Sequence, residues 1–478
     1  MYFTWDMVTT GWLLKNPKLG RFFLTLITLN IGAISVGLTM GLPNVSIPEF
    51  GDSANTETDV ALENVSLVET SIFIGASLGV LVPIFIVDVY GRRTTFIVFG
   101  VVNASSWILL ANAKDMVFII TGSFVGGFAV GIFLITATLF VSEISLPENR
   151  GTVATMTSLS GYFGIFIICY LGIHVDLQIL APGIIGFTIF FIISTSLWMN
   201  ESPYYLYKCG RVLDAKLSLM TLRGKTTILE IDEEHKSMVQ FFNSEIEYPT
   251  RVKRMINLMF GSGKMEMSMM FLLLTLCTTQ VIGGYAMTNY VDSIVSTQLP
   301  RYGTVFLALM NFVSVVCCLG TIEKIGRKFI LKLSCIGSST CYLIIFIYNF
   351  YYGTKCEPGN GTATSLIIII AIYYIIYTFG VIPVIPVLTS EIFPNKIKTV
   401  AIGFCFSSVY LANLIIAWLY FSLSHLMGVC PTFAVFTFTG AIGLPVIIWS
   451  LPETNGKSLY EIQHELRDEI IDPVIPSY

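Results

Sequence analysis

The chain is poor in charge, and its cysteines follow no metal-binding or redox spacing. Only 12% of its 478 residues are charged, about half of the roughly 25% that is typical of soluble globular proteins. The ten cysteines include no CxxC pair and no Cys/His spacing suited to a metal. A nucleotide-binding GxxxxGK[ST] loop is also missing. We therefore expect neither an enzyme nor a nucleotide-driven pump, and we expect no cofactor and no metal.

Long apolar runs fill most of the chain, and the mean hydropathy is +0.76. A helix needs about 20 apolar residues to cross a bilayer, and its backbone amides must be paired within the segment. The sequence therefore predicts an all-α polytopic membrane protein with twelve transmembrane helices. The predicted spans are 22–44, 67–88, 95–113, 116–141, 153–173, 181–199, 268–289, 303–322, 329–349, 364–388, 400–422 and 431–451.

The basic residues predict how these spans are oriented. Lysine and arginine gather on the cytoplasmic side of a membrane. With both termini inside, 24 of the 27 basic residues fall in cytoplasmic segments, and only Lys114, Arg301 and Lys355 do not. The first apolar run has spanning length and follows basic residues, so we expect no cleavable signal peptide.

Two glycosylation sequons fall outside the membrane in this topology. They begin at Asn64 and Asn360, whereas the sequon at Asn103 lies within a span and is discounted. Chance occurrence is the alternative for both. Cys356 and Cys430 also fall outside and could pair, although free thiols in an apolar setting are the simpler expectation.

The chain repeats itself on either side of one long polar stretch. "DVYGRR" starts at Asp88 and "EKIGRK" at Glu323, while "SEISLPENRG" and "SEIFPNKIKT" follow spans four and ten. Duplicated six-span halves are typical of secondary transporters, whose substrate site lies between the halves near mid-membrane. Acids and bases at the cytoplasmic helix ends could latch the halves together, with interfacial anchoring as the alternative for any single residue. The predicted segments are a cytoplasmic N-terminus 1–21, a bundle 22–199, a helical or disordered linker 200–266, a second bundle 267–451 and a cytoplasmic tail 452–478.

These motifs resemble those of the sugar porters of the major facilitator superfamily, nearest in character to facilitative glucose transporters and insect trehalose facilitators. "NESPYYLYKCGR" after span six and "LPETNGKSLYEI" after span twelve are similar to two further family signatures. The resemblance covers nearly the whole chain and implies two pseudo-symmetric six-helix bundles that transport a sugar by alternating access. The gate residues expected are Asp88, Arg92, Arg93, Glu143, Arg150, Glu201, Glu323, Arg327, Lys328, Glu391, Lys398 and Glu453.

The central site departs from the family pattern. Aligned without gaps, the family's sugar-covering Trp falls on Pro386, a binding Asn on Val409, and an Arg within span four on Ser123. Amides offer a sugar both donors and acceptors, so their loss points to an altered ligand. Helix–helix hydrogen bonding, or packing for the tyrosines, is the alternative for each remaining polar residue. The candidate sugar-binding residues are Ser158, Thr279, Gln280, Tyr285, Tyr290, Asn311 and Asn413.

Proton coupling is the remaining question about transport. Proton-coupled members of this family carry an Asp in span one, and Thr39 stands at that position here. With no carboxylate at mid-membrane, we expect passive uniport of a hexose or trehalose by a plasma-membrane monomer, and Glu69 is the residue that could overturn this. The alternatives are a proton symporter, a polyol or organic-acid transporter, and a sugar sensor that does not transport. An organic acid is disfavoured because no basic residue lies at mid-membrane.

Overall fold

The computed structural model describes residues 20–44, 59–225, 231–239 except 233 and 237, 303–352, 362–393, 395–427 and 431–439 except 433. Within these ranges the fold is nearly all helical. Eight of the described helices are long and apolar enough to cross a membrane, and a bent pair supplies a ninth candidate. A shorter apolar helix spans Gly303–Leu319.

The first half of the chain forms a bundle with one broken span. The break falls between Leu67–Gly79 and Val82–Tyr90, which meet at 44°, and Pro83 lies just inside the second piece, where a proline is tolerated. Two short helices follow the bundle. The helices are α3 (Gly20–Met40), η1 (Leu42–Asn44), α4 (Asp59–Gly79), α5 (Val82–Tyr90), α6 (Arg92–Ala111), α7 (Met116–Ile144), α8 (Arg150–Gly172), α9 (Leu177–Trp198), α10 (Pro203–Lys208) and α11 (Val212–Arg223).

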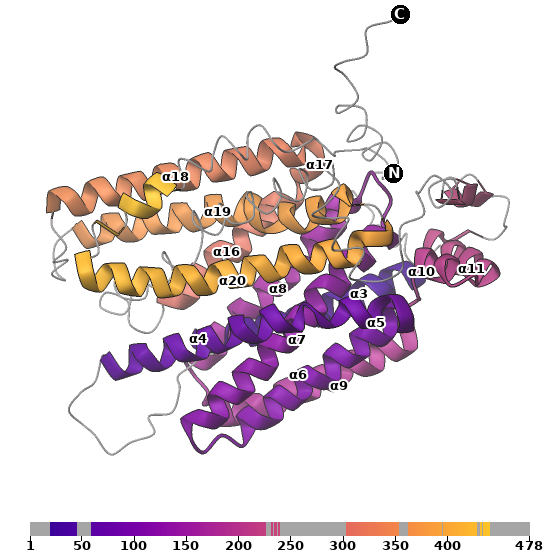
Figure 1. The fold of residues 1–478 in the computed structure, drawn as a ribbon, viewed down its shortest axis with the longest axis horizontal. Helices are drawn as coiled ribbons and strands as arrows, with labels where there is room; N and C mark the ends of the chain where they lie inside the picture. Colours follow the sequence, from indigo (N-terminus) through magenta and orange to yellow (C-terminus); the bar gives the residue numbers. More distant parts are fainter. Residues whose placement is uncertain are drawn as a thin grey trace, which may run out of the picture.

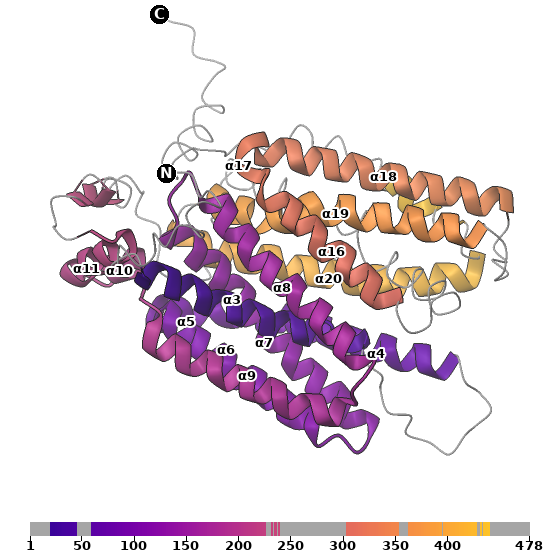
Figure 2. The same cartoon turned by 180° about the vertical axis from the view of Figure 1, so that it is seen from behind.

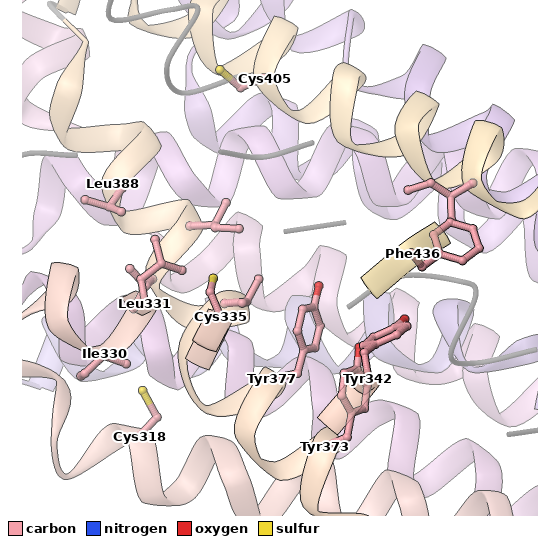
Figure 3. Packing of buried hydrophobic residues seen from close by; sticks show 14 of the residues in the cluster. Cys318, Ile330, Leu331, Cys335, Tyr342, Tyr373, Tyr377, Leu388, Cys405 and Phe436 are labelled. Carbon is pink, nitrogen blue, oxygen red and sulfur yellow. The ribbon is translucent and has the colours of Figure 1, made fainter. Parts of the chain in front are cut away.

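The second half contributes a smaller described bundle with an aromatic core. Tyr373 and Tyr377, one helical turn apart, stack with ring centroids 5.9 Å apart, and Tyr342 meets Tyr373 edge-on at 5.5 Å. Figure 3 shows these rings together among buried aliphatic side chains. The helices are α16 (Gly303–Leu319), α17 (Ile322–Ile325), α18 (Arg327–Tyr352), α19 (Thr362–Ile392) and α20 (Asn395–Met427).

The two halves lie side by side, as both views show (Figures 1 and 2). Helix α8 of the first half packs against α16 and α19 of the second, and α4 packs against α20. Helices α10 and α11 lie beyond one end of the bundle, the end toward which α5 and α17 also lie (Figure 1).

Matching glycines make the same turn in both halves at this end. Gly91 has φ of +92° and Gly326 has φ of +93°, a region that side chains with a Cβ rarely occupy. Each glycine lets an arginine begin the next helix at once, Arg92 in α6 and Arg327 in α18. The repeat inferred from the two motifs is therefore also a repeat of backbone conformation.

Ten of the twelve predicted spans coincide with described helices or with the bent pair. The span 268–289 lies outside the described residues, as do most of 431–451 and much of the linker 200–266. Several helices are longer than the predicted spans. Helix α7 ends at Ile144 instead of residue 141, and α8 begins at Arg150 instead of residue 153. Among the added residues, Glu143 and Arg150 are charged and buried, and each pairs with a residue of another helix, which accommodates these charges in the extended helices.

Candidate functional site

A cavity of about 290 Å³ lies between the two halves. Helices α3, α7 and α8 line it from the first half, and α19 and α20 from the second. On α8 its lining extends from Arg150 to Ile165, which corresponds to about 22 Å along a helix that rises 1.5 Å per residue. The cavity is therefore elongated along the bundle, in the place where an alternating-access transporter binds its substrate.

Most of the described lining is apolar, and several of its hydroxyl groups are committed elsewhere. Thr138, Thr157 and Ser158 each donate to a carbonyl oxygen four residues earlier in their own helix, at 2.7, 3.2 and 3.3 Å. Ser390 likewise donates to the Val387 carbonyl at 2.8 Å. These groups can still accept hydrogen bonds from a ligand, but their protons are already engaged.

Four polar side chains of the lining keep their hydrogen-bonding capacity. The hydroxyls of Tyr162, Tyr377 and Tyr410 and the amide of Asn413 make no hydrogen bond to another described residue. A phenol and an amide can each donate and accept, as sugar hydroxyls require. Together they form the principal polar part of the described wall.

Of the three predicted sugar-binding residues that the structure describes, two line this cavity. Ser158 and Asn413 line it, whereas Asn311 does not belong to the described lining. The Asn311 Oδ1 accepts a hydrogen bond from Thr378 Oγ1 at 2.5 Å, which joins α16 to α19. The other predicted residues, which lie outside the described ranges, are Thr279, Gln280, Tyr285 and Tyr290.

A cluster of charged residues, here named the charged seam, lies at the end of the cavity that Arg150 lines. Its first-half members centre on Arg92, which pairs with both oxygens of Glu143 at 2.6 and 2.9 Å and lies 3.4 Å from Asp88. Lys208 of α10 also pairs with Asp88, at 2.9 Å. The charged seam comprises Asp88, Arg92, Glu143, Arg150, Glu201, Lys208, Glu323, Arg327, Glu391 and Lys398.

Four of the contacts that the structure describes in the charged seam cross from one half to the other. Arg150 Nη1 lies 3.1 Å from Glu391 Oε1, and Lys398 Nζ donates to Ser142 Oγ at 2.8 Å. Glu323 accepts the backbone N–H of Thr152 at 3.0 Å. In the fourth, Thr399 Oγ1 donates to Asp88 Oδ2 at 3.4 Å. The two halves are thus fastened together at this end of the cavity.

The bases and acids of the predicted repeat do not pair with their own sequence neighbours. Glu143 pairs with Arg92, while Arg150, seven residues after Glu143, pairs across the seam with Glu391. Glu391 Oε1 also lies 3.9 Å from Arg327, a residue of its own half. Glu391 therefore keeps a cation nearby if the halves separate, whereas Arg150 loses its carboxylate partner.

Most of these charges lie at the end of their own helix where the helix dipole has the same sign as the charge. Arg92, Arg150 and Arg327 are the first residues of α6, α8 and α18, where the helix dipole is positive. Glu143 and Glu391 are each one residue from the end of α7 and α19, where the dipole is negative. Each charge is therefore stabilised by partners on other helices and not by its own, so the seam depends on its neighbours staying in place.

Two further carboxylates cap helices instead of pairing only with side chains. Glu201 accepts the backbone N–H groups of Arg92 and Arg93 at 2.9 and 3.2 Å, and the Arg93 guanidinium bonds to the Ser196 carbonyl. Burial raises the pKa of Glu201 above its ordinary value, a shift that these N–H groups partly offset. Burial likewise raises the pKa of Glu323, against the opposing effect of Arg327. Of the other predicted gate residues, Lys328 follows Arg327 in α18, and Glu453 lies outside the described residues.

A second buried polar cluster lies within the first half and carries no charge. Thr39 Oγ1 donates to Asn103 Oδ1 at 2.9 Å, and Asn103 Nδ2 donates to Ser35 Oγ at 2.9 Å. Trp107 Nε1 donates to Thr39 Oγ1 at 3.2 Å, and Thr188 lies 3.2 Å from Ser35. This neutral cluster joins α3, α6 and α9, and it places Asn103 in the protein interior, consistent with the discounting of its sequon.

Sequence reasoning missed several residues of both sites. Tyr162, Tyr377 and Tyr410 lie in apolar runs that contain many other aromatic residues, so nothing local marks them as cavity lining. Lys208 lies within the quoted motif after span six, but its partner Asp88 is 120 positions away, so the sequence does not reveal the pair. Arg150 was expected at the gate, and it also lines the floor of the cavity.

Known proteins resemble this chain over most of its length. The facilitated trehalose transporter Tret1 of Apis mellifera ligustica is 24% identical over 446 residues, which cover 92% of this chain and 87% of the relative. The arabinose-proton symporter of Bacillus subtilis (strain 168) is 27% identical over 421 residues, covering 83% and 85%.

A solved structure has the same fold. The proton:xylose symporter XylE bound to 6-bromo-6-deoxy-D-glucose superposes with a TM-score of 0.76 at 18% identity, covering 94% of this chain and 99% of XylE. The family model described as "Sugar (and other) transporter" matches residues 22–466. This protein therefore belongs to the sugar transporter family and has the major facilitator fold.

Proposed function

We propose that the protein is a facilitative uniporter that carries a hexose or trehalose across the plasma membrane by alternating access. The observation that carries the passive mechanism is the neutral cluster around Thr39. Every hydrogen-bonding group in it is uncharged and buried, whereas intramembrane proton relays use ionisable side chains. Hydrogen bonds without a titrating group offer no site at which a proton could be carried with the sugar.

The charged seam is proposed to be the cytoplasmic gate. It lies at the end of the bundle that the distribution of basic residues assigns to the cytoplasm, and it closes the cavity there. Opening breaks the four contacts that cross between the halves, and Glu391 then retains Arg327. Because a buried charge left unpaired costs about 3–5 kcal/mol, this retained partner lowers the cost of opening.

Proton-coupled symport is the alternative, and one residue favours it. Glu69 lies two positions after the start of the Leu67–Gly79 span and is partly buried. Among the described residues, the other carboxylates of the spans lie at helix ends within the charged seam. A symporter would therefore have to use Glu69 or a residue of the gate. A polyol transporter and a sugar sensor that does not transport remain further alternatives on the same scaffold.

Uptake into vesicles reconstituted with the purified protein tests the proposal. Radiolabelled glucose and trehalose are supplied with and without an imposed pH gradient. We expect saturable uptake that reaches the external concentration and does not respond to the gradient. Accumulation driven by the gradient would contradict uniport, and its loss in Glu69→Gln would identify the coupling residue. Protein-free vesicles give the background.

Oligomeric state and glycosylation are two further features that we propose for this protein. We propose a monomer glycosylated at Asn64 and Asn360, the two sequons predicted to lie outside the membrane. Treatment with an N-glycosidase is expected to increase electrophoretic mobility, and Asn64→Gln and Asn360→Gln are each expected to remove part of that shift. Unchanged mobility after treatment would contradict the assignment.

A further inference from the structure

The polar and apolar parts of the cavity wall lie at different depths. Tyr162 and Asn413 lie on stretches of α8 and α20 far from the charged seam, and Tyr377 lies at a similar distance from it along α19. Arg150 lies at the seam end, 12 residues before Tyr162, which corresponds to about 18 Å along the helix. The free hydrogen-bonding groups thus gather toward one end of an elongated space.

Between these two levels most of the described wall is apolar, and we name its apolar residues the apolar belt. Thr138, Thr157 and Ser158 line the same stretch, but their hydroxyl protons are engaged within their own helices, so they can only accept hydrogen bonds. A sugar placed wholly against the belt would lose water from its hydroxyls and gain few partners there, which is unfavourable. The apolar belt comprises Phe133, Leu134, Ala137, Ala154, Val381, Ile382, Ile385, Pro386, Phe406 and Val409.

Resting on the proposed transport function, we propose that the preferred cargo is a glycoside with an apolar aglycone, such as an aryl glucoside, and not a bare sugar. The glycosyl ring meets Asn413 and the phenols of Tyr162, Tyr377 and Tyr410. The aglycone contacts the apolar belt, and removing its apolar surface from water there is favourable. A disaccharide of similar length fits this wall less well, because both of its rings need polar partners.

Two positions of the belt are ones at which the resemblance to the sugar porters implies larger or more polar side chains. Pro386 and Val409 stand where that resemblance implies a Trp and an Asn, and both line the cavity. Val409 adjoins Tyr410 on α20. An amide at position 409 would put a donor and an acceptor into the belt, whereas a valine presents only methyl groups.

The inference is tested with vesicles that contain the full-length protein. Their uptake of 4-nitrophenyl β-D-glucoside is compared with their uptake of glucose and of trehalose. We expect a half-saturation concentration for the aryl glucoside at least tenfold below that for glucose, after subtraction of leakage into protein-free vesicles. Saturable uptake of bare sugars with no gain from the aryl group would overturn the inference and leave sugar transport standing. Inhibition of glucose uptake without entry of the aryl glucoside would also overturn it. Failure of all three compounds to enter would instead count against the proposed function.

A matched pair of variants locates the effect in the apolar belt. Val409→Asn is expected to lower the preference for the aryl glucoside over glucose at least fivefold. Ile415→Asn is the matched control, because it puts the same amide on an exposed face of α20 outside the described cavity lining, so the wild-type preference is expected to remain. If the asparagine variant retains the wild-type preference, the belt does not contact the cargo and the inference fails.

Discussion

At the scale of single residues, two glutamates each cap the N-terminus of a helix, one within its own half and one in the opposite half. Glu201 and Glu323 each accept backbone N–H groups at the start of a helix, where a negative charge is favoured. Glu201 caps a helix of its own half, so its contact persists through any movement of one half against the other. Glu323 caps α8 of the opposite half, so its contact forms only when the charged seam is closed.

This difference makes Glu323 a source of pH dependence in closure. Its pKa is raised by burial in the closed seam and returns toward its ordinary value of 4.5 when opening exposes it to water. The closed state therefore binds the proton more tightly, so its extra stability is present at low pH and is lost as the pH rises from about 4.5 through the raised pKa. We expect acidification from neutral pH to favour the closed seam.

The prediction is tested with spin labels at Glu148→Cys and Lys324→Cys, which lie exposed on opposite halves beside the seam. The short-distance population is expected to grow as the pH falls toward 5. In Glu323→Gln, which keeps an acceptor oxygen but does not titrate, this component of the pH response is expected to vanish. An unchanged response in that variant would assign the effect to another carboxylate of the seam.

A second prediction at the residue scale concerns Gly91. A Cβ there would lie 2.4 Å from Glu201 Oε2, and its φ of +92° is unfavourable for alanine. Gly91→Ala is expected to destabilise the protein by about 1–3 kcal/mol, as backbone strain of this kind does, and to lower the melting temperature in detergent. Gly210→Ala is the control, because φ is +77° there while nothing lies within 4 Å of its Cβ. An equal loss in both variants would attribute the effect to backbone strain alone and not to the Glu201 cap.

At the scale of helices, packing depends on small residues where backbones meet. Helices α3 and α8 approach so closely that a Cβ on Gly37 would lie 1.9 Å from the Gly161 carbonyl oxygen. The hydrophobic effect contributes little to the association of helices within lipid. Van der Waals packing at such close contacts therefore supplies much of their attraction. Because both helices line the cavity, their separation also sets its width.

Gly37→Ala is therefore expected to destabilise the first half by about 1–3 kcal/mol, the usual cost of overpacking. Gly183→Ala is the matched control, since a Cβ at that helical position meets nothing within 4 Å. Thermal unfolding of the two purified variants in the same detergent gives the comparison. Equal melting temperatures would mean that the backbones of α3 and α8 can separate without cost.

At the scale of the whole molecule, the charged seam fastens two halves that also pack against each other through α4 and α8. Arg150 and Glu391 are both nearly fully buried and 241 positions apart in sequence, and they form an ion pair of 3.1 Å between the halves. Within each half, further pairs such as Arg92 with Glu143 remain intact when the halves part. The seam can therefore open without dismantling either bundle.

Arg150→Ala is expected to shift the equilibrium toward the open seam by about 3 kcal/mol, near the lower limit for breaking a buried pair because Glu391 keeps Arg327. That corresponds to about a hundredfold change in the ratio of closed to open molecules. The same labels at positions 148 and 324 report it as a longer distance. Arg211→Ala, which breaks an exposed pair with Asp214, is expected to leave the distance unchanged. A short distance in both variants would contradict the latch.

The sequence by itself determined the class of fold, and it predicted most residues of the charged seam. Lipid requires long apolar helices, and two halves that share motifs such as "GRR" and "GRK" report duplication directly, so these features can be read without coordinates. The observed major facilitator fold and the match to the sugar transporter family confirm that prediction. The helix ends were less well predicted, because charged residues such as Arg150 stay helical through partners that the local sequence does not reveal.

Only the tertiary structure decided which charges pair and which side chains face the cavity. Arg150 meets Glu391 and not the nearer Glu143 because α7 and α8 direct these residues to different neighbours. Asn311 bonds to Thr378, whereas Asn413 faces the cavity, although both are asparagines within apolar helices. Periodicity shows that a residue lies in a membrane helix, but when a helix is apolar on all sides it does not reveal which side faces the ligand. The packing of the two halves supplies that information.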